Sequence, residues 1–439
     1  MRNRRNKRNF NSDLQYYLNI ISKLLIVLII IALLLFIYSA IKLKNSTLVG
    51  KNSSLQENPI SEINQPNLNE QIIVNSEEDP LNSSNIENIL KTNTKKSTTI
   101  NMALTGDIIY SNGILNDAYN KESDAYNFSY LFDNIKFNIQ TADIALGSLE
   151  TYFNSSNSKN SSLNNSFETF AYSLKKVGFD VLSTANNHCL DNGYSGLENT
   201  INTLDKTDIS HTGTFKSSEA QNTILIKNVK GLKVAFLNFS YGTNGKTIPN
   251  DKSYCVNLLS EKLVDEQIAL AKTEEPDIIC VSVHWGNRYQ QKQNLDQEKW
   301  TNLLFQKGAD IIVGNHPHVL QPMEKKEISL PDGKTKTGFV VYSLGNFLSD
   351  QTQNNTKASV ILNLKITKDL ENNKLTFDSI TYTPIYIYKN SSKSTQKFSI
   401  LNLKNTIASY DSGYDKSINS KDYTLFKSEL ENIKKVFGE

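Results

Sequence analysis

The sequence IICVSVHWG (residues 278–286) is followed by a helical pattern at residues 295–306 and then by IIVGNHPH (residues 311–318). Both apolar runs are short and rich in β-branched residues, which is typical of buried strands. Strand, helix and strand in this order indicate a βαβ unit with parallel strands. Each strand leads directly to histidine, so this stretch predicts both the class of fold and the edge of the sheet that carries chemistry.

The same alternation continues on both sides of this stretch. Further apolar runs occur at residues 100–104, 144–146, 181–184 and 234–239, and further helical patterns at residues 168–177, 196–204 and 259–272. Residues 338–344, 358–366 and 375–387 read as consecutive strands, with a turn at Asn372 and Asn373 between the last two. This pattern favours an α/β fold, and a four-layer α/β/β/α sandwich rather than a simple doubly wound sheet.

Five of the apolar runs end in residue types that bind metals. Loops beyond the carboxyl ends of strands converge in α/β sheets even when they are far apart in sequence. Carboxylates, an amide oxygen and imidazoles together suit Mn, Zn or Fe better than Ca or Mg. Four of the five histidines of the chain lie in these loops. The candidate residues are Asp107, Glu150, Asn187, His188, His284, His316 and His318.

Each candidate also has a purely structural explanation when it is taken alone: a cap, a solvated loop acid, a turn residue or a buried, hydrogen-bonded histidine. His316 and His318 are harder to explain in this way, because Pro317 stiffens the backbone between the two imidazoles. Taken together, the residues favour a metal site. His211 falls outside the pattern and is interpreted as structural or accessory.

An uncharged apolar run, LLIVLIIIALLLFIYSAI, occupies residues 24–41. A helix of this length spans about 27 Å, close to the hydrocarbon thickness of a bilayer. Five basic residues lie within the first eight positions and fewer follow the run, which places the N-terminus in the cytoplasm and the rest of the chain outside. We therefore expect an uncleaved single-pass anchor, rather than a cleaved signal peptide or a buried core helix.

Composition divides the rest of the chain. We expect a basic cytoplasmic N-terminus at residues 1–23, a flexible polar extracytoplasmic stalk at 42–97, the main domain at 98–389 and a C-terminal extension ending in a helix at 390–439. The formal net charge of +2 argues against a protein that coats polyanions, and no nucleic acid is expected as a partner. Three cysteines, Cys189, Cys255 and Cys280, exclude a disulfide scaffold and a CxxC zinc module.

Six segments resemble, in order, the CapA-type poly-γ-glutamate capsule synthesis protein family, which is related to calcineurin-like metallophosphoesterases. They are LTGDIIY (104–110), GSLET (147–151), STANNHCLDNG (183–193), VHWGNRY (283–289), GADIIVGNHPHVLQP (308–322) and VYSLGNF (341–347). The resemblance extends over residues 98–389, about two thirds of the chain, and the anchor agrees with that family.

The resemblance implies roles by position. The implied metal ligands are Asp107, Glu150, Asn187, His284, His316 and His318. His188 matches the residue that protonates the leaving group, and Asp191 is a candidate orienting partner for it. Ile109 stands where two-metal phosphoesterases have a histidine ligand, and Glu150 where they have aspartate. The missing histidine implies one divalent metal ion, with Mn, Zn or Fe favoured, rather than two.

Three functions remain open on this sequence. The first is a membrane-anchored component of capsule or poly-γ-glutamate synthesis or export, with other membrane-bound capsule synthesis proteins and an anionic polymer as partners. The second is an extracytoplasmic phosphoesterase unrelated to capsule, and the third is a non-enzymatic scaffold that binds polymer. If the protein is an enzyme, the expected chemistry is metal-assisted hydrolysis of a phosphoester or an amide.

Overall fold

The structure is a computed structural model that describes residues 96–153, 161–330, 333–414 and 417–438. These residues belong to one folded unit, residues 82–439. The expected cytoplasmic N-terminus and anchor, and the expected stalk up to residue 95, lie outside the described residues. Within the described part of the chain, no helix is long and apolar enough to cross a membrane.

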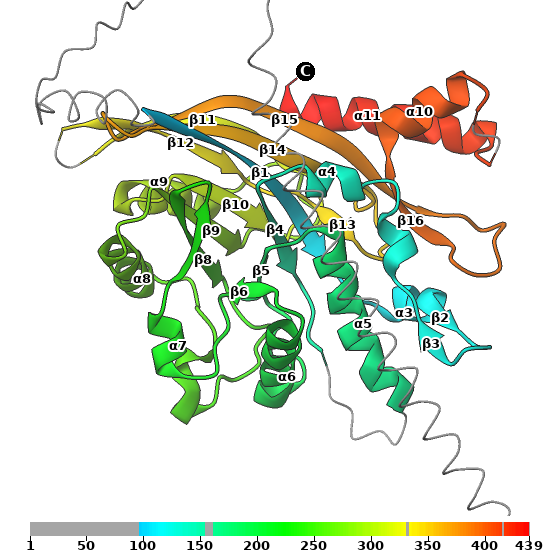
Figure 1. Cartoon of the computed structure of the whole chain (residues 1–439), viewed down its shortest axis with the longest axis horizontal. Helices are drawn as coiled ribbons and strands as arrows, with labels where there is room; N and C mark the ends of the chain where they lie inside the picture. Colours follow the sequence, from blue (N-terminus) through cyan, green and yellow to red (C-terminus); the bar gives the residue numbers. More distant parts are fainter. Residues whose placement is uncertain (1–95, 154–160, 331–332, 415–416, 439) are drawn as a thin grey trace, which may run out of the picture. The chain divides into compact units, whose positions relative to one another are not determined.

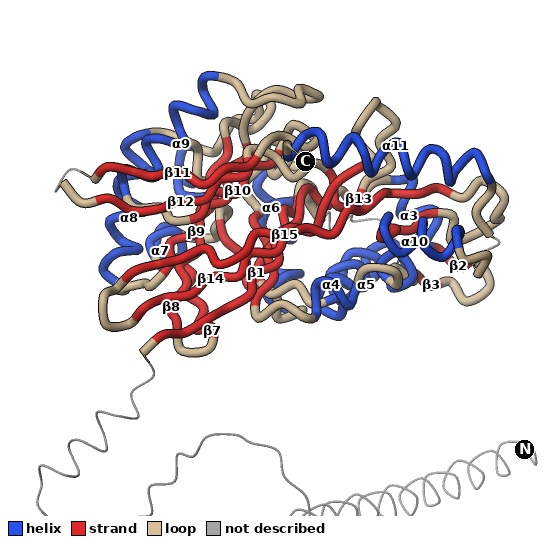
Figure 2. Tube along the Cα trace, turned by 90° about the horizontal axis from the view of Figure 1, so that it is seen from above, coloured by secondary structure: helices blue, strands red, loops and turns tan. Residues whose placement is uncertain are grey.

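The larger of the two main β-sheets has eight strands in the order β16-β15-β14-β1-β4-β5-β6, with β13 paired to β1 (Figures 1 and 2). β1, β4, β5 and β6 are parallel, and β14, β15 and β16 continue the sheet in antiparallel pairs. The carboxyl ends of β1, β4 and β5 therefore share one edge. The bounds are β1 (Ser97–Ile108), β4 (Ile144–Leu149), β5 (Val181–Ser183), β6 (Ser210–Thr212), β13 (Asn346–Leu348), β14 (Ala358–Asp369), β15 (Lys374–Lys389) and β16 (Phe398–Asn402).

The second sheet has six strands in the order β11-β12-β10-β9-β8-β7. β8, β9, β10 and β12 are parallel, and the edge strands β7 and β11 are antiparallel to their neighbours. The bounds are β7 (Leu225–Val229), β8 (Leu232–Ser240), β9 (Ile278–His284), β10 (Ile311–Asn315), β11 (Met323–Ser329) and β12 (Thr335–Val341). A separate short hairpin joins β2 (Tyr119–Asn120) and β3 (Ala125–Tyr126).

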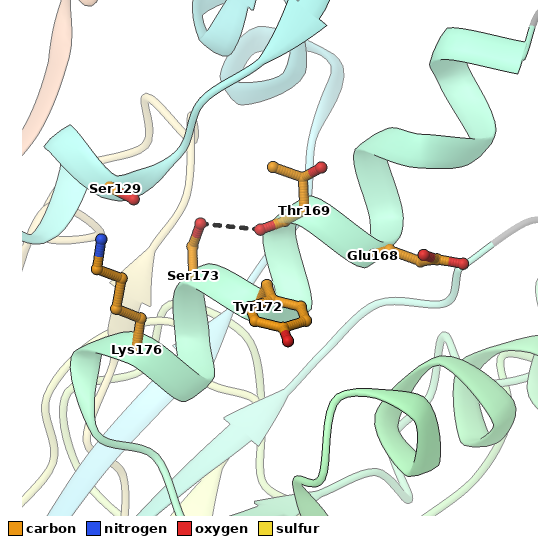
Figure 3. A pocket seen from close by; sticks show the side chains of 6 residues that line it. All are labelled: Ser129, Glu168, Thr169, Tyr172, Ser173 and Lys176. Atoms are coloured by element: carbon orange, nitrogen blue, oxygen red, sulfur yellow. Dashed lines mark hydrogen bonds between the residues drawn. The ribbon is translucent and has the colours of Figure 1, made fainter. Parts of the chain in front are cut away.

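The helices begin and end at residues suited to those positions. Asn294 and Gln297 form a capping box at the start of α9, and Gly308, with φ 133°, follows its last residue. Within α5, Ser173 Oγ donates to the main-chain carbonyl of Thr169, one turn earlier, at 2.8 Å (Figure 3). The bounds are α3 (Asn112–Ala118), η1 (Ser129–Phe132), α4 (Lys136–Gln140), α5 (Ser161–Val177), α6 (Gly193–Lys206), α7 (Ser218–Asn222), η2 (Asn250–Cys255), α8 (Glu261–Thr273), α9 (Leu295–Lys307), α10 (Leu403–Asp411) and α11 (Ser420–Phe437).

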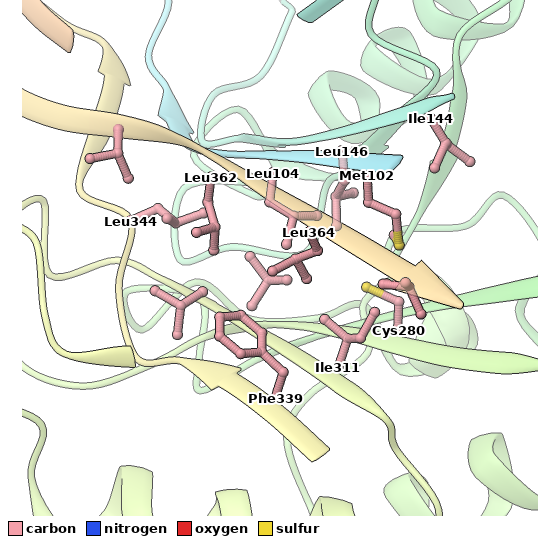
Figure 4. Close-up of a cluster of buried hydrophobic side chains, with 14 of the residues drawn as sticks. Met102, Leu104, Ile144, Leu146, Cys280, Ile311, Phe339, Leu344, Leu362 and Leu364 are labelled. Atoms are coloured by element: carbon pink, nitrogen blue, oxygen red, sulfur yellow. The ribbon is translucent and has the colours of Figure 1, made fainter. Parts of the chain in front are cut away.

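Alternate residues of the strands build separate cores on the two faces of each sheet. Between the sheets, Met102, Leu104 and Leu146 of the first pack with Cys280, Ile311 and Phe339 of the second (Figure 4). The opposite face of the first sheet packs against α4 and α5, and that of the second against α8 and α9. Two sheets thus face each other with helices outside them, and the predicted α/β class is confirmed.

The C-terminal segment differs from the extension expected after residue 389. β16 pairs with β15, so this segment adds the edge strand of the first sheet. The terminal helix α11 contributes Phe426 and Ile433 to the core between the sheets. The polar residues 390–397 form a connection within the domain, and the folded unit continues through α11. The expected strand at 338–344 also ends earlier, at Val341.

Candidate metal centre

The strand ends of both sheets meet at one buried cluster. Asp107 lies at the end of β1, and Glu150 directly follows β4. His284 is the last residue of β9, and His316 directly follows β10. All four, together with Asn187 and His318, are at most 3% exposed. The structure therefore brings together the six side chains that the sequence predicts as ligands.

In the part of the chain that the structure describes, the two carboxylates of the cluster form their ion pairs with histidines. Asp107 accepts hydrogen bonds from Ser148 Oγ at 2.9 Å and from the main-chain N–H of His316 at 3.0 Å. Glu150 Oε2 is buried and has no hydrogen-bond partner among the residues that the structure describes. Burial and the charge of Glu150 raise the pKa of Asp107 well above its usual range, and burial raises the pKa of Glu150 to about 8. Two acids at this depth require compensating positive charge.

The three imidazoles are held in the neutral form. Nε2 of His284 lies 3.1 Å from Nδ1 of His316, and Nδ1 of His318 lies 3.0 Å from Oδ1 of Asn346. Burial, and then repulsion by neighbouring positive groups, lowers the pKa of His284 and His316 and brings the pKa of His318 to about 3. His316 and His318 both have positive φ, 98° and 63°, which is uncommon for residues other than glycine and is often found at functional sites.

This donor set fits a divalent transition metal. Glu150, His284 and His316 offer ligand atoms within 4.8 Å of one another, and Asp107, Glu150 and His318 form a second such group. Among the described residues, the ion pairs of these carboxylates are with histidines alone. One buried atom each of Glu150 and His284 has no hydrogen-bond partner within the described ranges, and a bound cation would compensate such buried polar groups. Neutral imidazoles with carboxylates are ligands for Mn, Zn or Fe.

Asn187 presents its amide to the first of these groups. Its Oδ1 lies 2.7 Å from Nε2 of His284, one of the ligand atoms of that group. Turning the amide over would let Nδ2 donate to both His284 and Glu150. In that orientation Oδ1 would accept from Arg288 Nη2 at 2.9 Å, so the amide connects the buried ligands with the mouth of the centre.

His188 lies at the mouth of the centre rather than among the buried ligands. Its side chain is 35% exposed, and Nε2 is 3.9 Å from Oε1 of Glu150. Nδ1 lies 2.7 Å from Oδ2 of Asp191, so the contact expected between these two residues is present. A half-exposed imidazole oriented by a carboxylate, next to a metal centre, is placed to exchange a proton with a bound molecule.

Four residues near the centre were not predicted from the sequence: Arg288, Asn244, Tyr241 and Asn346. Arg288 Nη2 lies 3.1 Å from His188 Nε2, and Asn244 Oδ1 accepts from Asn187 Nδ2 at 2.9 Å. The ring of Tyr241 lies 4.7 Å from that of His316. Asn346 belongs to the segment VYSLGNF, so the resemblance marks its place in the chain without assigning it a role. Arg288 carries a signal in the sequence itself, since it is the only arginine after Arg8.

Two other features share no residue with this centre. His211, expected to be structural or accessory, lies outside the centre, with Nε2 3.1 Å from Asp205 Oδ1. The surface pocket beside α5 is lined by Ser129, Glu168, Thr169, Tyr172, Ser173 and Lys176 (Figure 3). Glu168 is the one carboxylate of this lining and no histidine is present, so the pocket does not resemble a transition-metal site.

The chain matches known proteins over the part that builds the centre. Residues 101–351, more than half of the chain, match the family described as bacterial capsule synthesis protein PGA_cap. The capsule biosynthesis protein CapA of Bacillus anthracis is 33% identical over 192 residues, which are 43% of this chain and 44% of that protein. The PGA biosynthesis protein CapA of Bacillus subtilis (strain 168) is 32% identical over 198 residues, 45% of this chain and 49% of that protein. The match thus spans a little less than half the length of these curated relatives.

Solved structures give a weaker likeness. A putative 5'-nucleotidase from Staphylococcus aureus in complex with alpha-ketoglutarate aligns with a TM-score of 0.43 and 13% identity, over 76% of this chain and 58% of that chain. The NAD nucleotidase (NadN) of Haemophilus influenzae aligns with a TM-score of 0.40 and 14% identity, over 78% and 61%. Scores at this level say nothing about activity. The match over residues 101–351 is sufficient by itself: the chain belongs to the bacterial capsule synthesis protein PGA_cap family.

Proposed function

We propose that this protein is a membrane-anchored, extracytoplasmic component of capsule or poly-γ-glutamate synthesis or export, and that its domain catalyses metal-dependent hydrolysis. The observation that carries the catalytic part is the convergence of two buried carboxylates and three neutral imidazoles, with no lysine or arginine ion-paired to the carboxylates among the described residues. Such a cluster does not stabilise the fold by itself, because burying ionisable groups costs free energy unless their charge is compensated.

The two groups of ligands are not equivalent. Glu150, His284 and His316, with the Asn187 amide, supply four ligands for one cation. Asp107, Glu150 and His318 supply three for a second position, and they share Glu150 with the first. Ile109 adds nothing there, because its side chain is apolar and its N–H donates to the carbonyl of Leu348. One cation bound tightly, at the four-ligand position, is therefore the arrangement that we propose.

The residues around this position suit hydrolysis. A bound divalent cation would supply Lewis acidity and a water of lowered pKa. Asp191 contacts Nδ1 of His188 and fixes the direction of the ring, so that Nε2 is the nitrogen available at the mouth of the site. In the proposed reaction a water oxygen would bond to phosphorus or carbon and release a proton to solvent, and the bond to the leaving group would break. His188, having taken a proton from solvent on Nε2, would deliver it to that group.

The proposed role in capsule synthesis is supported by the family match and by the names of two curated relatives. Both curated relatives are named for capsule or PGA biosynthesis, and each is matched over less than half of its length. We propose the corresponding polymer, an anionic chain of γ-linked glutamate, as the molecule handled by this domain. Other membrane-bound capsule synthesis proteins are proposed as partners, with the apolar run at residues 24–41 as the anchor.

Metal content and turnover test the catalytic proposal together. The purified full chain is dialysed, analysed for divalent metals, and assayed with Mn²⁺ on phosphomonoesters, phosphodiesters, nucleotides and γ-glutamyl amides. We expect near one equivalent of tightly bound metal and hydrolysis of one of these classes. Tight metal with no turnover on any class would favour the polymer-binding scaffold. Absence of tight metal would reject the centre.

The topology has its own test. Protease added to intact protoplasts should remove the domain and leave the anchored N-terminus, because the basic residues before the anchor hold that end in the cytoplasm. A cytoplasmic protein provides the control for intact membranes. Protection of the whole chain would contradict the proposed orientation.

A further inference from the structure

Arginine is almost absent from this chain outside its N-terminus. Four of the five arginines lie within the first eight residues, and Arg288 is the fifth. Everywhere else after Arg8, lysine supplies the positive charge. The two are not interchangeable, because a guanidinium is planar, keeps its charge and presents paired donors that match a carboxylate or a phosphate. An arginine at this position, where lysine is otherwise used, suggests that the planar, paired donors of a guanidinium are needed there.

The backbone that carries Arg288 is fixed to the loops of the metal centre. On one side, Trp285 N–H donates to the carbonyl of Asn315 at 3.1 Å. On the other, Tyr289 N–H donates to the carbonyl of Pro317 at 2.8 Å. Arg288 is thus held between two hydrogen bonds to the segment that contains His316 and His318. Its exposed side chain extends from a positioned backbone rather than from an independent surface loop.

The guanidinium of Arg288 lies against His188 and against the amide of Asn187, whose oxygen would accept from Nη2 at 2.9 Å if the amide were turned over. Nη2 of Arg288 lies 3.1 Å from His188 Nε2. A guanidinium has donors and no acceptor, so Nε2 must be the unprotonated nitrogen of this ring, and Nδ1 carries the proton that Asp191 accepts. A neutral ring nitrogen is a weaker partner for a guanidinium than a carboxylate or phosphate, because it carries no opposite charge and can accept from only one of the paired donors.

We propose that Arg288 binds an anionic group of the substrate, a phosphate or a carboxylate, beside the bond that is cleaved, and that this group replaces His188 as its partner. The inference rests on the proposed function and names the substrate class of the same site. A divalent cation would balance the two carboxylates Asp107 and Glu150. With those charges balanced, the positive charge of the Arg288 guanidinium remains, and it would attract an anion to the mouth of the centre.

The walls of the mouth agree with a substrate that extends out of the site. Tyr241 and Tyr289 are 48% and 42% exposed, so both rings present a face to solvent beside the centre. The Tyr241 ring lies 4.7 Å from that of His316, and the Tyr289 ring 6.0 Å from that of His318. Tyr241 thus lies beside His316 and Tyr289 beside His318. Arg288 directly precedes Tyr289 in the sequence. A chain with repeated acidic groups can place one of them at Arg288 and its backbone along the tyrosines.

Equilibrium binding of two small anions tests the proposal. The full chain with Mn²⁺ is titrated in a calorimeter with inorganic phosphate and, separately, with γ-linked diglutamate. Arg288→Gln is expected to raise the Kd of the recognised anion at least about tenfold, and Arg288→Lys to raise it less, since lysine keeps the charge without the paired donors. Lys292→Gln is the matched control, because it removes the same charge from an exposed residue of the same loop. It should leave the Kd unchanged.

The two anions distinguish between a phosphate and a carboxylate as the substrate group that Arg288 binds. A selective loss of phosphate binding assigns Arg288 to a phosphoester substrate, and a selective loss of diglutamate binding assigns it to the polymer. Equal affinities for wild type and Arg288→Gln, or no binding of either anion by the wild type, would overturn the proposal. Metal content is measured on each sample, so loss of the metal centre, which rejects the proposed function, is recognised separately. A merely structural role of Arg288 would lower thermal stability and metal content instead of the affinity alone.

Discussion

The main-chain N–H of His316 donates to Oδ2 of Asp107 at 3.0 Å, although 209 residues separate the two in sequence. Asp107 ends a strand of the first sheet, and His316 follows a strand of the second. This bond therefore joins the two sheets at the metal centre itself. It also helps to hold His316 at its unusual φ of 98°, so the position of an imidazole ligand depends on the packing of the sheets.

The ligand groups predict how metal content responds to substitution. Replacing His316 and His318 together by Ala should remove most of the metal, whereas His318→Ala alone should leave near one equivalent, because His318 belongs only to the group with Asp107. Elemental analysis after dialysis measures both. His211→Ala, outside the centre, is the control and should retain full metal. Full retention in the double variant would reject the site, and two tight equivalents in the wild type would reject the single-metal arrangement.

His188 and Asp191 should affect turnover without affecting metal content. We expect His188→Ala to lower kcat by about 10²- to 10⁴-fold, the usual contribution of a positioned proton donor, and Asp191→Asn by about 10- to 100-fold. Both variants should keep the metal, because His188 lies at the mouth and is half-exposed. Asp205→Asn, which removes the partner of His211, is the matched control for a histidine–carboxylate pair outside the centre. Loss of metal in His188→Ala would assign this residue to the ligands instead.

The buried acids predict how the stability of the metal-free protein depends on pH. The pKa of Glu150 is raised to about 8, so the folded state keeps a proton that the unfolded chain has lost above about pH 5. The lowered pKa values of the histidines act in the opposite sense, but only below about pH 6.5, where unfolded histidines bind protons. Between about pH 6.5 and 8, stability should therefore fall as pH rises, by at most ~1.4 kcal/mol per pH unit for one proton.

Thermal unfolding at several pH values measures this dependence. Added Mn²⁺ should reverse the loss, because the cation favours the ionised carboxylate. Glu150→Gln should reduce the slope above pH 6.5 in the metal-free protein, and the buried Asp107, whose pKa is also raised, accounts for any slope that is left. A metal-free wild type that gains stability from pH 6.5 to 8 would show that the carboxylates are already compensated within the chain.

Gly106, the residue before Asp107, should not tolerate a side chain. A Cβ at this position would overlap the main-chain carbonyl of Gly345, which accepts a hydrogen bond from Asp107 N–H. The added Cβ and the Gly345 carbonyl both belong to positions fixed by the main chain, which cannot move aside as a flexible side chain can. We therefore expect Gly106→Ala to destabilise the protein by about 3 kcal/mol or more. Urea unfolding measures the change. Gly242→Ala is the control, since a Cβ there meets no atom within 4 Å. Equal stabilities of the two variants would contradict this packing.

Much of the architecture was predictable because strands and helices leave local patterns. Runs such as those ending at His284 and at Asn315 are short, apolar and separated by a helical pattern, and the structure has β9, α9 and β10 there. The C-terminal boundary was not predictable in this way. The polar residues 390–397 look like the end of a domain, and only the pairing of β16 with β15 shows that the sheet continues.

The sequence by itself determined which side chains stand at strand ends, since polar residues that follow buried runs must emerge at the edge of a sheet. It thereby placed Asp107, Glu150 and the histidines among the candidates. The tertiary structure alone decided that β1, β4 and β5 belong to one sheet and β9 and β10 to the other, and that their ends meet. It alone placed Arg288 against His188, 100 residues away. The reason is physical: strand patterns arise from neighbours in sequence, whereas the packing of two sheets depends on contacts between distant segments that no local period records.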